Sequence, residues 1–475
     1  MKKFWLVSLL LGLLATAAMA DLMNNQVTVA HVGGKVRWSQ IALGPDGVAH
    51  VVFIEMLDAD YRNVVTYVKY DGTTASTPIQ LNAHFDEYCM QPYITVSSKG
   101  VVAAVWGQPR EQGVFMRVFD PAVGDWSAVE KVSDWGVDEP SVAVESNGNI
   151  HVQFWNGDYG RVMARSKING IWEDEVVISK EDVRCMKGQI ALGIDGTIWI
   201  CWSQRDCGNP NACEYKTHYR TRTATTSWTP QTWVNETGIS QELPFIAVGP
   251  DGMPWVAWGD SDMDEQTAIA VCKLNGADNP IEFLTARGSQ HGPRVAADFF
   301  NNCHIACQQG GGDFGFGILY LTNMNGFWQS QMMWGGYTKA GGVSADGFGN
   351  VAVSWSAWYG AEGSDVFINS LTPVAPKYFL PPVNLSVTLA LSGVRRSPRA
   401  TYTLSWNANP DNTDDFLAGY KIYVKENAGS YQLLATVGKT TFSQSFDFTD
   451  LSKKRKFAIS TANLGGGESE LLEFY

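Results

Sequence analysis

The stretch Pro244-Phe-Ile-Ala-Val-Gly-Pro-Asp-Gly252 decides the fold of this chain. It begins with a short apolar segment, which an Asp-Gly turn ends. A second apolar segment follows the turn and ends at Trp258. Asp-Gly between two apolar segments provides the positive φ angles that a tight turn requires, so the stretch predicts a β-hairpin.

The same pattern recurs along the chain, with constant offsets from the opening residue to the turn and to the closing residue, which is usually aromatic. The turn residues are Gly47, Gly100, Gly148, Gly196, Gly252, Asn301 and Gly349. A second hairpin follows in most copies, for example at Asn169-Gly170, so a copy contains four short strands. Four strands repeated about every fifty residues are typical of a propeller blade, and we expect seven blades.

The ends of the repeat region predict how the ring closes. The last copy shows three strands, and Gln26 to Val32 forms an unassigned strand ahead of the first copy. We expect this strand to complete the last blade and to cover its exposed edge. The alternative is an open solenoid of stacked hairpins.

The copies resemble the sialidase-like and BNR-repeat-like propellers of exported bacterial proteins, through the pattern Pro-x-x-Ala-x-x-x-Asp-Gly over roughly residues 25–372. The chain departs from true sialidases in two ways. It has no Ser-x-Asp-x-Gly-x-x-Trp box, which Ser344-Ala-Asp346-Gly-Phe only approaches, and no Arg-Ile-Pro strand start for a carboxylate-binding arginine. The resemblance implies an architecture more than an activity.

A change in composition near residue 373 marks a second domain. Residues 373–382 carry four prolines, which is typical of a linker. Beyond them, alternating strands resemble a fibronectin type III module, with Trp406 and the segment Tyr420 to Tyr423 at that family's recurring positions. We therefore predict an all-β chain with a signal peptide (1–20), a seven-bladed β-propeller (21–372), a linker (373–382) and a fibronectin type III-like β-sandwich (383–475).

The net charge indicates which partners the chain disfavours, and the N-terminal segment indicates to which compartment it is sent. It has 35 Lys and Arg against 48 Asp and Glu, a net charge of −13, which disfavours binding to nucleic acid. Lys2 and Lys3 precede a short apolar stretch and an Ala18-Met19-Ala20 cleavage site. We expect export to the periplasm or beyond, and we find no apolar run long enough for a membrane span.

Eight cysteines in an exported chain are first considered as disulfides. The one pair that we assign is Cys207 with Cys213, because the turn-forming loop between them is short enough for a bridge to close. Two free thiols are the alternative. The connectivity of the other six cysteines stays open.

In a propeller, the loops that leave each second strand and those that join the blades converge on one face. Carboxylates and aromatic rings around such a concavity suit a carbohydrate ligand, and an ordinary solvated loop face is the alternative. The candidate ligand-binding residues are Asp134, Trp135, Asp158, Tyr159, Arg184, Glu242, His291, Trp358 and Tyr359.

One loop places carboxylates at alternate positions, as calcium-binding loops do: Asp260, Asp262 and Asp264. Calcium is therefore the candidate cofactor, against the alternative of an acidic solvated loop.

We expect a binding or interaction protein whose partner is a glycan or a cell-surface or extracellular protein. The alternative is a carbohydrate-active enzyme, a glycoside hydrolase or a polysaccharide lyase, whose catalytic residues the sequence leaves unassigned.

Overall fold

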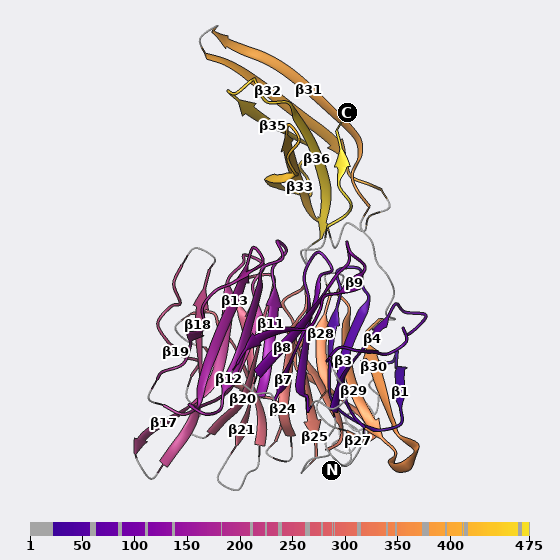
Figure 1. The fold of residues 1–475 in the computed structure, drawn as a ribbon, viewed down its shortest axis with the longest axis vertical. Helices are drawn as coiled ribbons and strands as arrows, with labels where there is room; N and C mark the ends of the chain where they lie inside the picture. The colour runs from indigo at the N-terminus through magenta and orange to yellow at the C-terminus, as the bar shows by residue number, and fades with distance from the viewer. Residues whose placement is uncertain are drawn as a thin grey trace, which may run out of the picture.

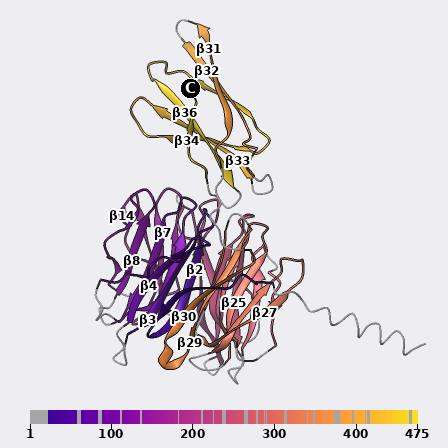
Figure 2. The ribbon, with the colours of Figure 1, turned by 90° about the vertical axis from the view of Figure 1, so that its right-hand side faces the viewer.

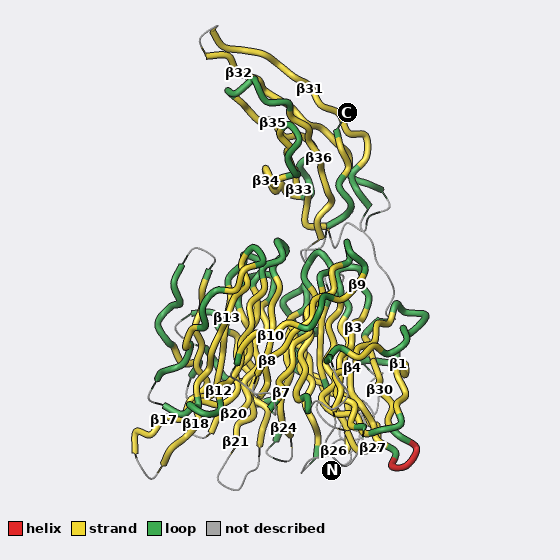
Figure 3. Tube along the Cα trace, viewed as in Figure 1, coloured by secondary structure: helices red, strands yellow, loops and turns green. Residues whose placement is uncertain are grey.

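The computed structural model describes a defined part of the chain. Its ranges are 22–57, 63–83, 88–109, 113–134, 138–181, 183–209, 212–223, 226–235, 240–261, 267–276, 279–286, 288, 290–310, 315–338, 341–346, 349–372, 380–394, 397–410, 412, 417–463 and 468–474. Antiparallel β-sheets make up the fold, and a short 3-10 helix, η2 (Gly360–Glu362), is coloured red in Figure 3. No helix within these ranges is long and apolar enough to cross a membrane.

The N-terminal sheets follow one another along the chain, each built from consecutive antiparallel strands (Figure 1). The first contains β2 (Lys35–Leu43), β3 (Ala49–Met56), β4 (Asn63–Tyr70) and β5 (Ile79–Gln80). The next contains β6 (Met90–Val96), β7 (Val102–Gln108), β8 (Gly113–Asp120), β9 (Asp125–Trp126) and β10 (Glu130–Ser133). After it come β11 (Asp138–Val144), β12 (Ile150–Asn156), β13 (Arg161–Ile168), β14 (Ile171–Trp172) and β15 (Val176–Val177).

The same arrangement continues through the rest of this region (Figure 2). The fourth group is β16 (Cys185–Leu192), β17 (Ile198–Asn209), β18 (Ala212–Arg222) and β19 (Thr232–Trp233). The fifth is β20 (Ser240–Val248), β21 (Pro254–Ser261), β22 (Thr267–Lys273) and β23 (Glu282–Phe283). Then follow β24 (Gln290–Ala297), β25 (Cys303–Gln309), β26 (Gly315–Thr322) and β27 (Gln329–Thr338), and finally β28 (Gly342–Ala345), β29 (Val351–Trp358) and β30 (Ser364–Ser370).

The N-terminal strand joins the two ends of this series. β1 (Val27–Val32) pairs antiparallel with β30, from Val27 opposite Ile368 to Val32 opposite Ser364. One hydrophobic cluster contains Val29 and Val366 together with Ile41 and Phe53 of the first sheet. The expected closure by this strand is confirmed, and the sheets form a closed, propeller-like ring.

The core lies between neighbouring sheets. Each cluster of buried side chains in the ring combines residues from two consecutive sheets, as when Ile54 of β3 packs in one cluster with Trp106 of β7. The residues that end the repeated pattern are all fully buried here: Phe53, Trp106, Phe154, Trp202, Trp258, Cys307 and Trp355. The turn residues have positive φ, from 66° at Asn301 to 89° at Gly148, as the hairpin prediction requires.

The C-terminal region contains two further sheets. One has the order β31 (Val383–Val394), β32 (Ser397–Asn407) and β35 (Ser443–Phe448). The other has the order β34 (Gln432–Gly438), β33 (Leu417–Glu426), β36 (Arg455–Asn463) and β37 (Leu472–Glu473). Trp406, Tyr420 and Phe457 share one cluster between them, so this region has its own core.

Three buried histidines hold neighbouring strands together through hydrogen bonds. His50 Nδ1 lies 2.7 Å from the Tyr67 hydroxyl, and His304 Nδ1 lies 2.7 Å from the Tyr320 hydroxyl. His151 contacts Ser166 Oγ at 2.9 Å and Glu145 Oε1 at 2.7 Å. All three histidines lie on the second strands of their sheets, where they are packed and hydrogen-bonded.

The closing strand predicts a large stability difference between two neighbouring substitutions. Val29→Asp puts a carboxylate into the cluster that closes the ring, whereas Thr28 is exposed on the same strand. We expect Val29→Asp to lower the free energy of unfolding by at least about 3 kcal/mol, and Thr28→Asp by less than about 1 kcal/mol. Equal melting temperatures for the two variants would show that β1 does not close the ring.

Acid should weaken the fold through His50. Burial lowers the pKa of His50 to about 4 from 6.5, so between these pH values the unfolded chain binds a proton that the folded chain does not. The stability is therefore present above pH 6.5 and is lost as the pH falls toward 4, by about 3 kcal/mol for this group. Denaturant unfolding of His50→Gln should show a shallower loss between these values than His31→Gln, in which an exposed histidine is replaced.

Candidate ligand-binding site

Six of the first strands in the ring begin at a β-bulge, whereas β28 pairs with β29 without a register shift. The pairing register shifts at this point in six sheets, for instance between Met90 and Tyr93 in β6 and between His291 and Arg294 in β24. The residue nine positions before the turn is left-handed in these sheets: Trp38, Gln91, Glu139, Lys187, Leu243 and Gly292. A left-handed conformation costs a residue other than glycine about 1–3 kcal/mol, and such strain often accompanies a functional site.

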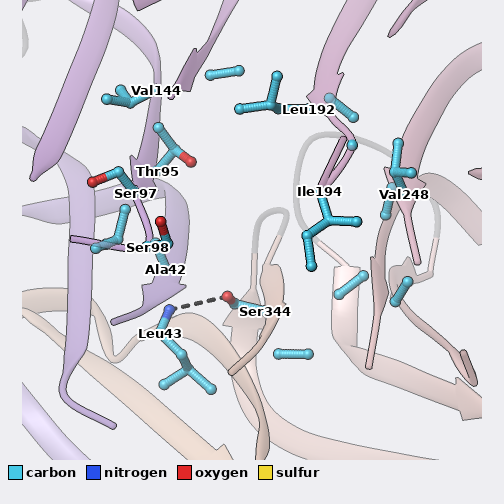
Figure 4. Close-up of a pocket in the computed structure, with 18 of the residues that line it drawn as sticks. Ala42, Leu43, Thr95, Ser97, Ser98, Val144, Leu192, Ile194, Val248 and Ser344 are labelled. Atoms are coloured by element: carbon cyan, nitrogen blue, oxygen red, sulfur yellow. Dashed lines mark hydrogen bonds between the residues drawn. The ribbon is translucent and has the colours of Figure 1, made fainter. Parts of the chain in front are cut away.

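Two cavities lie along the axis that the first strands surround. The larger has a volume of about 610 Å³ and is lined by β2, β6, β11, β16, β20, β24 and β28 toward their glycine turns. Figure 4 shows hydroxyl side chains, among them Thr95 and Ser97, on one side of it and aliphatic side chains, among them Ile194 and Val248, on the other. The smaller cavity, about 20 Å³, lies at the bulges where the strands begin. Tyr93 lines both, so its layer separates them.

Polar side chains from three consecutive sheets form a chain of contacts at the bulges. The Gln91 side-chain amide donates to Glu139 Oε1 at 3.0 Å, and the Glu139 backbone N–H donates to Gln91 Oε1 at 2.9 Å. Lys187 Nζ donates to the same carboxylate oxygen at 2.8 Å. Glu139 therefore balances the charge of Lys187, and the two lie at equivalent positions of neighbouring sheets.

Arg294 is a buried cation at the smaller cavity, with only 8% of its surface exposed. Its guanidinium lies over the Phe245 ring at 3.8 Å, and Nη1 donates to the carbonyl oxygens of Gly292 and Pro293 at 3.3 and 3.4 Å. Its Nε finds no acceptor among the described residues. Burial lowers the pKa of Arg294, against the opposing influence of Glu139, so the charge is incompletely compensated.

Tyr93 stands beside this arginine in the same layer. Its hydroxyl shares a hydrogen bond with the Gln189 side chain, and burial raises the pKa of Tyr93 to about 12. Arg294 acts in the opposite direction by favouring the phenolate. The phenol is therefore protonated at neutral pH and can donate a hydrogen bond to an anion.

The described residues among those proposed from sequence follow second strands or precede first strands, so they lie at the same end of the sheets as the smaller cavity. Asp134, Asp158, Tyr159, Arg184 and Tyr359 are exposed there. Glu242 in β20 is partly buried, and Trp358 at the end of β29 is partly covered by Lys35 Nζ, 4.0 Å from its ring centre. Trp135 and the His291 side chain lie outside the part that the structure describes. Asp134 is ion-paired with Lys131 at 2.6 Å.

The axial residues, which line the smaller cavity and its bulges, lie at strand starts and were not among the residues proposed from sequence, most of which lie in loops. Tyr93, Gln189 and Arg294 lie seven residues before the turn, and Gln91, Glu139 and Lys187 lie nine before it. That constant offset is the signal that could have found them. The loop pattern predicts a concavity at the loop end, whereas the larger cavity lies toward the glycine turns.

The metal and disulfide predictions stay untested. Asp260 is buried in β21, and Asp262 and Asp264 lie outside the described residues, among which no group of three His, Cys, Asp or Glu side chains could hold a metal. The side chains of Cys207 and Cys213 also lie outside this part. The remaining six cysteines are buried free thiols: Cys89, Cys185, Cys201, Cys272, Cys303 and Cys307.

No protein-family profile and no curated protein matches this sequence. Among solved structures, a fungal alcohol oxidase in complex with copper is 12% identical, with a TM-score of 0.49, and the match covers 95% of this chain and 98% of that one. An ulvan lyase of polysaccharide lyase family PL25 is 10% identical, with a TM-score of 0.46 and coverage of 71% and 95%. An α-L-arabinanase of Penicillium chrysogenum is 13% identical, with a TM-score of 0.44 and coverage of 60% and 94%.

Arg294 predicts an unusual mutational response. Replacing an incompletely compensated buried cation with an apolar side chain of similar length is often neutral or stabilising. We expect Arg294→Met to leave the melting temperature unchanged or raised. Arg455 is the matched control, because its side chain is only 3% exposed but is ion-paired with Glu426 at 2.9 Å.

Arg455→Met should lower the free energy of unfolding by roughly 1–3 kcal/mol. Thermal denaturation of both variants checks the comparison. A loss in Arg294→Met as large as in Arg455→Met would show that Arg294 is a structural residue.

Proposed function

We propose that this chain is an exported protein that binds an acidic glycan at the bulge end of its ring. The observation that carries the proposal is Arg294, a buried guanidinium at a cavity with an N–H that lacks an acceptor. A carboxylate or sulfate group of a glycan would supply that acceptor and the missing negative charge. The exposed rings of Tyr159 and Tyr359 offer surfaces on which sugar rings can stack.

The proposed architecture is a seven-bladed propeller, in residues 21–372, followed by a linker and a fibronectin type III-like domain in residues 383–475. The strands that line the larger cavity support seven blades, since β2, β6, β11, β16, β20, β24 and β28 each begin one hairpin repeat. The separate core around Trp406 and the two sheets of three and four strands support the second domain. The segment at residues 1–20 supports export by a signal peptide, to the periplasm or the cell exterior.

Binding assays with charge variants test the proposal. Titration calorimetry of the full chain should show affinity for uronate-containing or sulfated oligosaccharides that falls with rising salt. Arg294→Met and Lys187→Met should weaken this binding about 10- to 100-fold, the effect of one lost charge-assisted hydrogen bond. Lys273→Met is the matched control, since Lys273 is similarly exposed and ion-paired but lies near the glycine turn at Asp251.

Unchanged affinity in Arg294→Met would remove the axial site from consideration. Selective binding of neutral glycans would contradict the acidic ligand. Binding of an extracellular protein with no glycan dependence would replace the glycan by a protein partner.

The second candidate function is a carbohydrate-active enzyme, and the placement of Tyr93 beside Arg294 favours a polysaccharide lyase. An arginine that neutralises a uronate carboxylate would acidify the adjacent C5–H bond. In its phenolate form, which Arg294 favours, Tyr93 would take that proton, the C4–O bond would break as a C4=C5 double bond forms, and the departing oxygen would receive the proton from Tyr93. Incubation with the bound oligosaccharide, followed by ultraviolet absorbance of the unsaturated product, tests this. Turnover that Tyr93→Phe abolishes would establish the lyase, and binding without product would leave the protein non-enzymatic.

A further inference from the structure

β31 is an open edge strand in the C-terminal region. Its sheet has the order β31-β32-β35, so β31 pairs with β32 on one side and has no strand partner on the other within the described residues. Residues 383–394 read VNLSVTLALSGV and contain no charged residue and no proline. Soluble proteins commonly protect such an edge with lysine, proline or a covering element, and residues 386–394 of this strand have none of these.

The apolar face of β31 extends beyond the core that it helps to build. Leu385 and Val387 pack against the C-terminal core cluster. Leu389 and Leu391 continue on the same face but are 54% and 71% exposed. Across the sheet, Leu389 lies opposite Tyr402 and Leu391 opposite Ala400 of β32.

The apolar pattern of this strand is symmetric about its middle. Leu385 and Leu391 lie equally far from Thr388, and so do Val387 and Leu389. A second β31 that pairs antiparallel about a two-fold axis at Thr388 would therefore place apolar side chains opposite apolar ones. The other face would pair small uncharged residues, among them Ser386 and Ala390, so no like charges would meet.

We propose that β31 is a dimerisation edge, at which two copies of this chain pair their β31 strands antiparallel into one continuous six-stranded sheet. Figure 1 shows β31 as an outer strand whose hairpin tip points away from the N-terminal sheets, so the ring leaves this edge accessible. The pairing satisfies the unpaired backbone groups of both strands and covers Leu389 and Leu391. A dimer would also carry two rings, which raises the avidity for any repeated ligand.

Sedimentation equilibrium of the full chain at physiological salt tests the proposal, over about 1–100 µM. We expect a reversible monomer–dimer equilibrium for the wild type. Leu391→Lys should shift the dissociation constant at least about tenfold toward monomer, since it places a charge opposite the apolar Leu385 of the partner subunit. Leu433→Lys is the matched control, because Leu433 is 55% exposed on β34, the edge strand of the other sheet.

A wild-type chain that stays monomeric throughout this range overturns the proposal. A dimer that Leu391→Lys and Leu433→Lys weaken equally also overturns it, since the contact would then lie elsewhere. Leu391 is mostly exposed, so unchanged melting temperatures in both variants should confirm that neither change acts through folding.

Disulfide trapping tests the two-fold register. Thr388→Cys would place the two thiols directly opposite each other, whereas Ser392→Cys would place each thiol opposite Asn384 of the partner subunit. Mild oxidation should therefore give a covalent dimer of Thr388→Cys within a time at which Ser392→Cys and the wild type remain monomeric on a non-reducing gel. Equal trapping of the two variants would overturn the proposed pairing.

Discussion

Burial of both faces of every ring sheet is the constraint on which the rest of the molecule depends. The strands are apolar on both sides, as in β7, where all residues from Val102 to Gln108 are buried. Such a sheet is stable only between two neighbours, so each hydrophobic cluster is shared by consecutive sheets. A series of sheets with this requirement must close, and β1 closes it by covering the edge of β30.

Closure also creates the axial site. The first strands cannot fill the centre of the ring with their own backbone, so a cavity of about 610 Å³ remains between them. The bulges turn the side chains at the strand starts toward this axis and close it at one end. Tyr93, Phe245 and Arg294 meet there although their sheets are far apart in sequence.

The axial layer combines features that stability alone does not explain. Left-handed φ angles at Gln91, Glu139 and Lys187 are strained, and the buried Arg294 has an N–H without an acceptor. By contrast, His151, a buried histidine of the scaffold, contacts Ser166 Oγ and Glu145 Oε1 through its two ring nitrogens. A buried cation beside strained strand starts distinguishes the candidate site from the scaffold.

The repeat could be predicted from sequence because its signals are local. Asp-Gly and Asn-Gly turns, alternating apolar residues and the aromatic at the end of each hairpin depend on neighbours within about fifteen residues, and the structure confirms the positive φ at Gly252 and the burial of Trp258. The closing role of the strand around Val29 also followed from counting strands. In contrast, the loop residues proposed from sequence, such as Tyr159, lie outside the axial layer, since polarity alone does not distinguish a solvated loop from a binding surface.

Tertiary structure alone decided the composition of the axial site. Glu139 and Lys187 are separated by about fifty residues, and nothing in their local sequences marks them as an ion pair. They meet because ring closure superimposes equivalent positions of successive repeats around one axis. Sequence therefore determined the repeating unit and its turns, which short-range sterics and periodicity control, whereas the chemistry at the centre depended on how many such units close and at what angle.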